Sequence, residues 1–245
     1  MSGKKTVEIV IPIYNEEKEL EANISKLYNF LDNSLRSYLW LIIIADNAST
    51  DRSKAISKRL MKRFPRVRYQ YFDQKGRGRA VKKTWQKSKA EYLCYMDVDL
   101  STDLQSILPI LDSLSNDFDI AIGSRLLPES KVIGRTLKRE ILSRVYNIMI
   151  KTMFQTHFSD AQCGFKAVTR TVVKNLIPYI EDNAWFFDSE LLIIGDKLGY
   201  KIFEEPVHWI DNPGSTVRVM KTVRGDLSGL WRLFWTRPWY KIKKI

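Results

Sequence analysis

Cysteine, histidine and long apolar runs are all scarce in this sequence of 245 residues. The two cysteines, Cys94 and Cys163, lie in apolar or small-residue surroundings and give neither a disulfide framework nor a metal-ligand spacing, which predicts a reducing, cytosolic compartment. Residues 1–6 lack the apolar core of a signal peptide, and no apolar run approaches the roughly 20 residues of a membrane-spanning helix. We therefore expect a cytosolic protein that does not span a membrane.

Acidic residues are also few: 28 Asp and Glu stand against 40 Lys and Arg, which leaves a net charge of +12. The excess of positive charge is concentrated in two segments. Residues 52–89 contain fifteen basic residues and one acidic residue, and residues 218–245 contain eight basic residues and one acidic residue. Such surfaces favour phosphate-rich partners: nucleic acid, anionic lipid or nucleotide. For either block alone, a solvated basic face without a partner is the alternative.

Apolar runs alternate with segments of helical spacing through the first 125 residues. The runs predict strands at 6–12, 39–45, 67–71, 92–96 and 119–123. The intervening segments predict helices at 16–35, 53–64, 79–89 and 104–114. This alternation is typical of an α/β fold with a doubly wound, mostly parallel sheet.

The second half of the chain has a different character. We expect helices at 135–154, 168–175 and 187–198 and a strand at 201–209. The first of these helices has a broad apolar face and several basic residues, and residues 230–240 mix aromatic side chains with cations. Both features are typical of amphipathic elements at a membrane interface. Ordinary core packing is the alternative for the helix.

Two carboxylates one residue apart follow the predicted strand at 92–96. If strand geometry persists, Asp97 and Asp99 face the same way. Ligands of open α/β sheets bind beyond the carboxyl ends of the strands. Two hard oxygen ligands there suit a divalent cation, which can in turn hold a diphosphate. A solvated acidic turn is the alternative reading of this pair.

Three other polar clusters follow predicted strands. After the first strand, Tyr14 can stack on a base and Glu16 can bind a ribose hydroxyl, although for this cluster alone a proline-led turn with helix N-terminal acids is the better explanation. After the second, Asp46 can accept a hydrogen bond from a base or ribose. The run Lys75-Gly76-Arg77-Gly78 precedes a helix, so its glycines and the helix N-terminus can approach phosphate, but it lacks the spacing of a P-loop.

In this order, the clusters resemble the GT-A nucleotide-sugar domain of family 2 glycosyltransferases. The second half is similar to the polyprenyl-phosphate glycosyltransferases, which include the dolichyl-phosphate mannose and glucose synthases and their bacterial counterparts. The matching segments there are Gly123-Ser124-Arg125, Arg139 with Ser143, 160–167, 187–192 and 205–209. The resemblance covers about residues 6–220. It implies a GT-A catalytic domain at 1–217, with a nucleotide-sugar half at 1–125 and an acceptor half at 126–217, followed by a basic, aromatic, membrane-contacting tail at 218–245.

The resemblance also implies a role for each matching residue. It implies that the nucleotide sugar is bound by Pro12, Tyr14, Glu16, Asp46, Lys75, Gly76, Asp97, Val98 and Asp99. It implies that Mg2+ or Mn2+ is held by Asp97, Asp99 and Ser101. It implies that the acceptor phosphate is held by Arg125, Arg139 and Ser143, and that the sugar pocket is lined by Asp160, Gln162, Gly164, Phe165 and Glu190. The implied catalytic set is Asp97, Asp99, Arg125 and Asp188; for Asp188, a helix N-terminal acid is the alternative.

The sequence departs from the family pattern at two places. Ser101 stands where mannosyl members commonly have a glutamine as a metal ligand. The arginine that usually precedes a Gly-x-Ser turn is missing from residues 209–218, and Arg218 can replace it only if the loop folds over. The Trp-x4-Gly-Ser pattern that begins at Trp209 looks more like the glucosyl branch, so glucose is favoured over mannose.

The resemblance, with the features above, implies an inverting, metal-dependent hexosyltransferase on the inner, cytoplasmic face of a membrane. Its donor would be UDP-glucose or GDP-mannose and its acceptor a polyprenyl phosphate such as dolichyl or undecaprenyl phosphate. One alternative is a family 2 enzyme with a soluble or polysaccharide acceptor, and another is an inactive relative that serves as a scaffold. A basic nucleic-acid-binding protein is the non-enzyme alternative, but no nucleic-acid motif appears and we expect no such partner. Homo-oligomerisation stays open.

Overall fold

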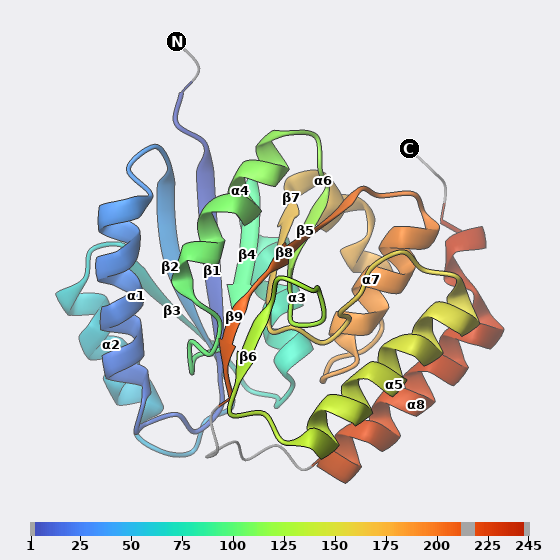
Figure 1. Ribbon diagram of the computed structural model, residues 1–245. Helices are drawn as coiled ribbons and strands as arrows, with labels where there is room; N and C mark the ends of the chain where they lie inside the picture. The colour runs from blue at the N-terminus through green and yellow to red at the C-terminus, as the bar shows by residue number, and fades with distance from the viewer. Residues whose placement is uncertain (1–2, 212–218, 243–245) are drawn as a thin grey trace.

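The computed structural model describes residues 3–211 and 219–242, and a seven-stranded sheet lies at the centre of that part (Figure 1). Its strands are β1 (Thr6–Ile13), β2 (Leu39–Asn47), β3 (Val67–Phe72), β4 (Tyr92–Met96), β5 (Ile120–Ser124), β7 (Phe165–Thr169) and β8 (Ile202–Pro206). They are ordered β3-β2-β1-β4-β7-β5-β8, with β7 antiparallel to both neighbours and the other pairs parallel. A separate parallel pair is formed by β6 (Lys131–Ile133) and β9 (His208–Ile210). The expected α/β fold with a mostly parallel sheet is confirmed.

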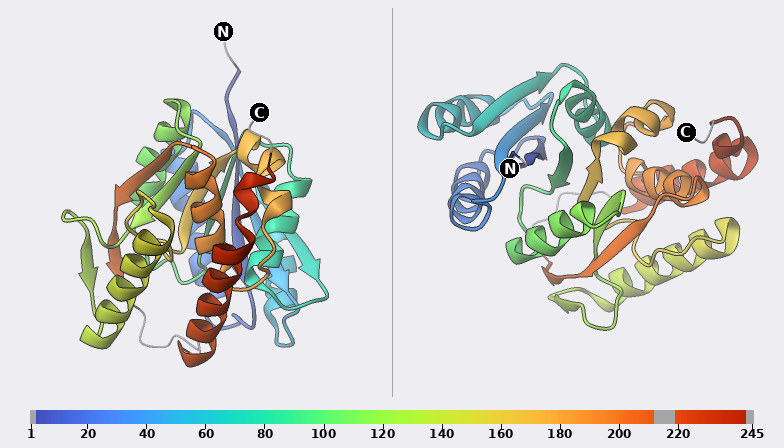
Figure 2. Two further views of the ribbon diagram at one scale, coloured as in Figure 1. Left: turned by 90° about the vertical axis from the view of Figure 1, so that its right-hand side faces the viewer. Right: turned by 90° about the horizontal axis from the view of Figure 1, so that it is seen from above.

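Helices cover both faces of this sheet (Figures 1 and 2). One face is covered by α1 (Leu20–Ser34), α2 (Ser53–Arg63) and α4 (Ile107–Ser115). The other is covered by α3 (Arg77–Lys87), α5 (Leu137–Phe154), α6 (Arg170–Asn175), α7 (Phe187–Lys197) and α8 (Val219–Thr236). Short 3-10 turns lie at Leu104–Ser106, Ile177–Tyr179 and Pro238–Tyr240.

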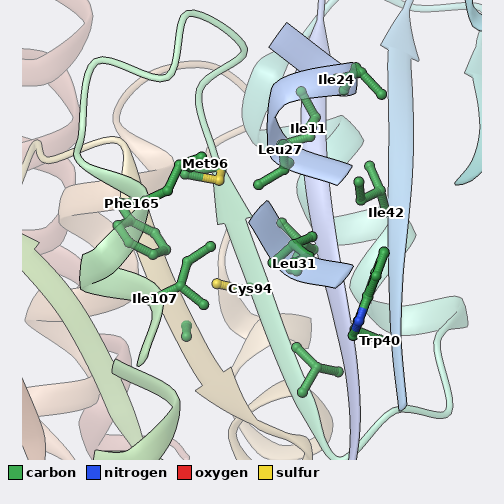
Figure 3. Close-up of a cluster of buried hydrophobic side chains, with 14 of the residues drawn as sticks. Ile11, Ile24, Leu27, Leu31, Trp40, Ile42, Cys94, Met96, Ile107 and Phe165 are labelled. Carbon is green, nitrogen blue, oxygen red and sulfur yellow. The ribbon is translucent and has the colours of Figure 1, made fainter. Parts of the chain in front are cut away.

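Alternation along the strands divides the core into two clusters, one on each face of the sheet. In β1, Ile9 and Ile11 pack with α1, whereas Val10 packs on the opposite side. Figure 3 shows the first cluster, in which Leu27 and Leu31 of α1 face the sheet. Because side chains point alternately to the two faces of a strand, an apolar run covered on both sides fills both clusters.

Two sequence expectations need correction, and the strand β7 was not predicted. The segment 168–175 is not one helix, since Val168 and Thr169 complete β7 and only the following residues form α6. The antiparallel pairing of β7 with β4 and β5 is a long-range contact that the local pattern does not report. The predicted strand 201–209 divides at Val207, where β8 leaves the main sheet and β9 joins β6.

Residues 230–236 of the aromatic segment near the C-terminus form the last turns, about two in number, of a long helix, α8, which the sequence analysis did not predict, and residues 238–240 form a 3-10 turn. Figures 1 and 2 show α8 beside α5 along one side of the molecule. Thr136 caps α5 through its side chain. Within the described residues, no helix is long and apolar enough to cross a membrane.

Candidate active site

The polar clusters predicted to follow β1, β2 and β4 meet at one edge of the sheet. Because these strands are parallel neighbours, their carboxyl ends lie side by side; Ile13 of β1, for example, pairs with Asp46 of β2. Asp97 and Asp99 follow β4 directly and are both half-buried. The structure therefore brings the residues predicted to bind nucleotide and metal together.

Asp97 is held by an arginine to which the sequence analysis gave no role. Arg77, the first residue of α3, donates from Nη2 and Nε to Oδ1 of Asp97 at 2.6 and 3.0 Å. On the other side, Oδ2 of Asp97 faces Gly164, where a methyl group would lie 1.8 Å from it. Asp97 is thus fixed between α3 and the turn before β7.

Asp99 accepts a hydrogen bond from the backbone N–H of Ser101 at 3.0 Å. Burial and the charge of Asp97 raise the pKa of Asp99. Burial, followed by the charges of Glu19, Asp99, Asp51 and Asp97, raises the pKa of Glu16 to about 7. Ser101 itself is buried, so it supports Asp99 from behind.

A divalent cation fits this edge by its donor chemistry. Two half-buried carboxylates one residue apart provide hard oxygen ligands, and burial together with neighbouring carboxylates raises the pKa values of Asp99 and Glu16. Within residues 3–211 and 219–242, no three His, Cys, Asp or Glu side chains come together as a closed metal site. An open site of this kind suits Mg2+, which is commonly bound by one or two carboxylates together with substrate phosphates.

The residues predicted to bind the nucleoside are present at this edge with different exposures. The Lys75 ammonium lies 3.3 Å from the centroid of the Tyr14 ring, which is half-buried. Pro12 lies within β1 and is buried, as is Val98. Asp46 is fully buried, and its oxygens accept from the Ser49 backbone N–H and the Tyr69 hydroxyl, both at 2.8 Å. Asp46 is therefore buried beneath the residues predicted to bind the nucleoside and supports them from below.

The first turn of α3 differs from the expectation that it binds phosphate. The N–H groups of Gly78 and Arg79 donate to the carbonyls of Ala184 and Asn183, both at 3.1 Å. Gly76 donates to the Asn47 side chain at 3.0 Å. These backbone N–H donors are occupied because the chain before α7 packs closely on the glycines. Positive charge for a phosphate must therefore come from side chains here.

Asp188, predicted to contact the sugar, is buried in a network with side chains from three elements. Nη1 of Arg77 lies 2.7 Å from its Oδ2, and Nζ of Lys166 lies 2.9 Å from its Oδ1. The Tyr95 hydroxyl donates to the same carboxylate. Burial raises the pKa of Asp188, and burial lowers the pKa of Lys166. Asp188 therefore anchors Arg77 rather than facing an open pocket.

Arg125 and Asp160, predicted for the acceptor phosphate and the sugar pocket, form a bidentate ion pair. Nε and Nη2 of Arg125 lie 2.8 and 3.0 Å from the two oxygens of Asp160. Burial alone would raise the pKa of Asp160, but the charge and hydrogen bonds of Arg125 outweigh it and hold that pKa at about 2. The guanidinium carbon of Arg125 also lies 4.9 Å from the Trp209 ring centroid.

A cavity of about 570 Å3 opens beside Arg125, between the β5–β6 loop and α5. Arg135 and Arg144 also line it, and Glu140 pairs with both at 3.0 and 2.6 Å. Its apolar wall consists of Leu126, Leu127, Pro128, Val132 and Leu137. The cavity thus combines guanidinium groups with an apolar surface.

Arg139 and Ser143 of the predicted acceptor set lie outside this cavity lining. Arg139 donates from Nη1 to Asp211 at 2.6 Å. The Ser143 hydroxyl is buried, and among the described residues it has no hydrogen-bond partner. Arg218, which was considered as a substitute for the loop arginine, lies outside the described residues.

The remaining sugar-pocket residues form the contact between the β4–β7 region, α7 and α8. Gln162 donates from Nε2 to Asp226 of α8 at 2.8 Å, and Glu190 accepts from Arg232 of α8 at 2.8 Å. Phe165 is fully buried in the core. Glu190 also accepts from two backbone N–H groups and is fully buried, which separates it from the sheet edge.

A family model described as glycosyl transferase family 2 matches residues 8–177. The chain belongs to this family. Glycosyltransferase AglD of Haloferax volcanii is 31% identical over 94% of this chain and 37% of that protein. The dolichyl-phosphate beta-glucosyltransferases of Dictyostelium discoideum and Saccharomyces cerevisiae are 29% and 26% identical, each over 84% of this chain and 67% of the relative. The chain thus spans little more than a third of the first relative.

Solved structures confirm the GT-A fold expected of a family 2 glycosyltransferase. Glucosyl-3-phosphoglycerate synthase from Mycobacterium tuberculosis, in complex with Mn2+, uridine diphosphate and phosphoglyceric acid, has a TM-score of 0.70 at 15% identity. This match covers 94% of this chain and 78% of that one. The same enzyme in complex with Mg2+ and uridine diphosphate has a TM-score of 0.67, also at 15% identity, over 93% and 79% of the two chains. At this identity the likeness establishes the fold.

Sequence analysis gave no role to three residues of this family 2 site. For two of them, a charged residue within an apolar pattern could have indicated a role. Lys166 interrupts the apolar strand β7, where a fully buried lysine requires a partner. Asp226 occupies the buried stripe of α8 that includes Leu230 and Leu233, and burial together with nearby carboxylates raises its pKa to about 7. The role of Arg77 had no comparable signal, because it depends on Asp188, 111 residues away.

Proposed function

We propose that this protein transfers a hexose, with glucose favoured over mannose, from a nucleotide sugar to a polyprenyl phosphate. The observation that carries the proposal is the position of the Asp97/Asp99 edge and the arginine-lined cavity beside Arg125 within one family 2 domain. Among the curated relatives, the dolichyl-phosphate beta-glucosyltransferases of two organisms have names that state both a sugar and an acceptor. They support both the lipid acceptor and glucose.

The donor lies at the carboxyl edge of β1, β2 and β4 in this proposal. Asp97 and Asp99 hold Mg2+ or Mn2+ while Ser101 orients Asp99, and Tyr14, Lys75 and their neighbours form the nucleoside wall. The cation, when bound, neutralises charge on the departing nucleoside diphosphate. Complexes of structural neighbours with Mn2+ or Mg2+ and uridine diphosphate support the binding of a divalent cation together with a nucleoside diphosphate.

The acceptor phosphate binds beside Arg125, where the cavity provides guanidinium groups for the phosphate and an apolar wall for the first lipid units. Guanidinium suits this task because it offers paired donors to phosphate oxygens. Arg139 and Ser143 belong to the same acceptor half, and Arg139 becomes available when its contact to Asp211 opens.

The reaction in this proposal is a single in-line displacement. The attacking phosphate is already an anion, so no strong general base is required. Arg125 holds that anion close to a diphosphate that would otherwise repel it, and alignment of the two reactants supplies much of the acceleration. An α-linked donor then gives a β-linked product.

The acceptor is a membrane lipid, and α5 with α8 forms the surface that meets it. On α5, Leu137, Ile141, Val145 and Ile148 are 52–75% exposed, and on α8 Trp231 and Trp235 are 61% and 67% exposed. Tryptophan and cations favour the interface of an anionic membrane. We place the protein peripherally on the cytoplasmic face, with a catalytic domain at 1–217, divided into donor half 1–125 and acceptor half 126–217, and a membrane-contacting segment at 218–245.

Two alternatives have weaker support. A soluble or polysaccharide acceptor leaves the exposed apolar face of α5 and α8 without a role. Nucleic-acid binding rested on the basic block at 52–89, but Arg52, Arg59 and Arg66 pair with acidic side chains of the α1 region, and Arg77 is buried.

The test is a product assay with purified protein, Mn2+ and polyprenyl phosphate. UDP-glucose, UDP-N-acetylglucosamine and GDP-mannose are supplied in separate reactions, and lipid products are identified by mass spectrometry. We expect a hexosyl lipid from UDP-glucose that disappears in Asp99→Ala. No lipid product from any donor, with nucleotide release on addition of a soluble glycan, would contradict the proposal.

A further inference from the structure

Arg77 joins two carboxylates to which the sequence analysis gave different roles. Its Nε and Nη2 contact Oδ1 of Asp97, and its Nη1 contacts Oδ2 of Asp188. The guanidinium carbon lies 4.8 and 4.9 Å from the ring centroids of Tyr95 and Trp185, and the side chain is 9% exposed. The buried guanidinium thus contacts two carboxylates and two aromatic faces at once.

The two carboxylates hold Arg77 unequally. Asp188 is 5% exposed and is fixed from behind by Lys166 and Tyr95, so its position is rigid. Asp97 is 30% exposed and lies at the edge where the cation is proposed to bind. The Asp188 contact is therefore the permanent anchor, and the Asp97 contact is the one that can open.

The surroundings of Asp97 leave little room for a divalent cation beside the guanidinium of Arg77. Its Oδ1 already accepts two N–H groups from Arg77, and its Oδ2 faces Gly164. A divalent cation on Oδ1 would lie within a few ångströms of the guanidinium, and like charges at that distance repel each other. Binding of the cation at Asp97 therefore requires the guanidinium to withdraw.

We propose that Arg77 competes with the divalent cation for Asp97 and that the donor's diphosphate relieves the competition by accepting the guanidinium. Nη1 stays on Asp188 while Nε and Nη2 turn from Asp97 to diphosphate oxygens, for which a guanidinium is well suited. Cation and nucleotide then bind cooperatively, because each removes an obstacle to the other. This inference rests on the proposed function, since it presupposes a cation and a nucleoside diphosphate.

The test measures Mn2+ affinity by electron paramagnetic resonance without and with saturating UDP, with GDP in parallel. The proteins are wild type, Arg77→Gln and Lys83→Gln, whose lysine is an exposed cation on the same helix. For wild type and Lys83→Gln we expect UDP to raise Mn2+ affinity by about tenfold or more. For Arg77→Gln we expect tighter Mn2+ binding without nucleotide and a smaller further gain from UDP than in wild type, since the diphosphate can still bind the cation directly.

Mn2+ affinity without nucleotide that is unchanged or weaker in Arg77→Gln would overturn the inference, even with hexose transfer intact. Failure of wild type to bind Mn2+ in the presence of either nucleotide would contradict the proposed function, and the inference with it. A second measurement uses wild type and does not depend on the stability of Arg77→Gln. The Nε–H resonance of Arg77, identified by its loss in Arg77→Lys, should shift on addition of Mg2+ with UDP, and an unmoved resonance would overturn the inference.

Discussion

Replacement of Gly164 by alanine should disable the site through Asp97. The added methyl group would lie 1.8 Å from Oδ2 and 2.6 Å from Cγ of Asp97, far inside contact distance. Asp97 cannot retreat freely, because its backbone N–H donates to the Gly164 carbonyl at 3.1 Å and, before the donor binds, Arg77 also holds its other oxygen. A displacement of about 1 Å at a reacting centre typically lowers turnover by about 100-fold. Overpacking of this kind costs about 1–3 kcal/mol of unfolding free energy.

The assay for Gly164→Ala compares the initial rate of hexose transfer with the thermal midpoint. Gly225→Ala on α8 is the matched control, since a methyl group there meets nothing within 4 Å and alanine favours a helix by up to about 1 kcal/mol. We expect the control to keep wild-type activity and stability or to gain stability. Wild-type turnover in folded Gly164→Ala would refute the argument that Asp97 must hold its position.

Three further variants test other parts of the structure. Gly229→Ala brings a methyl group within 2.2 Å of the Phe186 ring, so calorimetry should show a free energy of unfolding lowered by about 1–3 kcal/mol. An unchanged thermal midpoint would contradict the packing of α8 on Phe186. Burial raises the pKa of Asp226 from 3.8 to about 7, so its contribution to stability is complete below pH 3.8 and lost as pH rises through 7. Asp226→Asn should therefore raise the thermal midpoint relative to wild type more at pH 8 than at pH 5, and an equal effect at both would contradict the raised pKa. Replacement of Trp231 and Trp235 together by alanine should lower affinity for anionic vesicles at least about tenfold in cosedimentation, and unchanged binding would place the membrane surface elsewhere.

Local pattern predicted the first half of the fold because its strands are continuous apolar runs between helices of regular spacing. β1, β2 and β4 were expected within a few residues of their observed bounds, and their parallel order brings Asp46, Asp97 and Asp99 to one edge. Helix α5 was predicted in the same way from its apolar face. The placement of carboxylates after strands follows from sequence order alone.

Contacts between distant segments could not be predicted in this way. The antiparallel insertion of β7 between β4 and β5 depends on pairing across the sheet, and the division of 201–209 depends on the partner that β9 finds in β6. The engagement of the α3 N-terminus by Ala184 and the burial of Asp188 beneath Arg77 are likewise tertiary. The family resemblance indicated that Asp188 matters, but only packing shows that it anchors an arginine.

The most direct measurement offers UDP-glucose with two matched acceptors, a polyprenyl phosphate and the same polyprenol without phosphate. The proposed mechanism needs an anionic nucleophile held beside Arg125, so glucose should appear on the polyprenyl phosphate alone, in β linkage, and Asp99→Ala should abolish the product. Equal transfer to the free polyprenol, or an α-linked product, would contradict in-line attack by the acceptor phosphate.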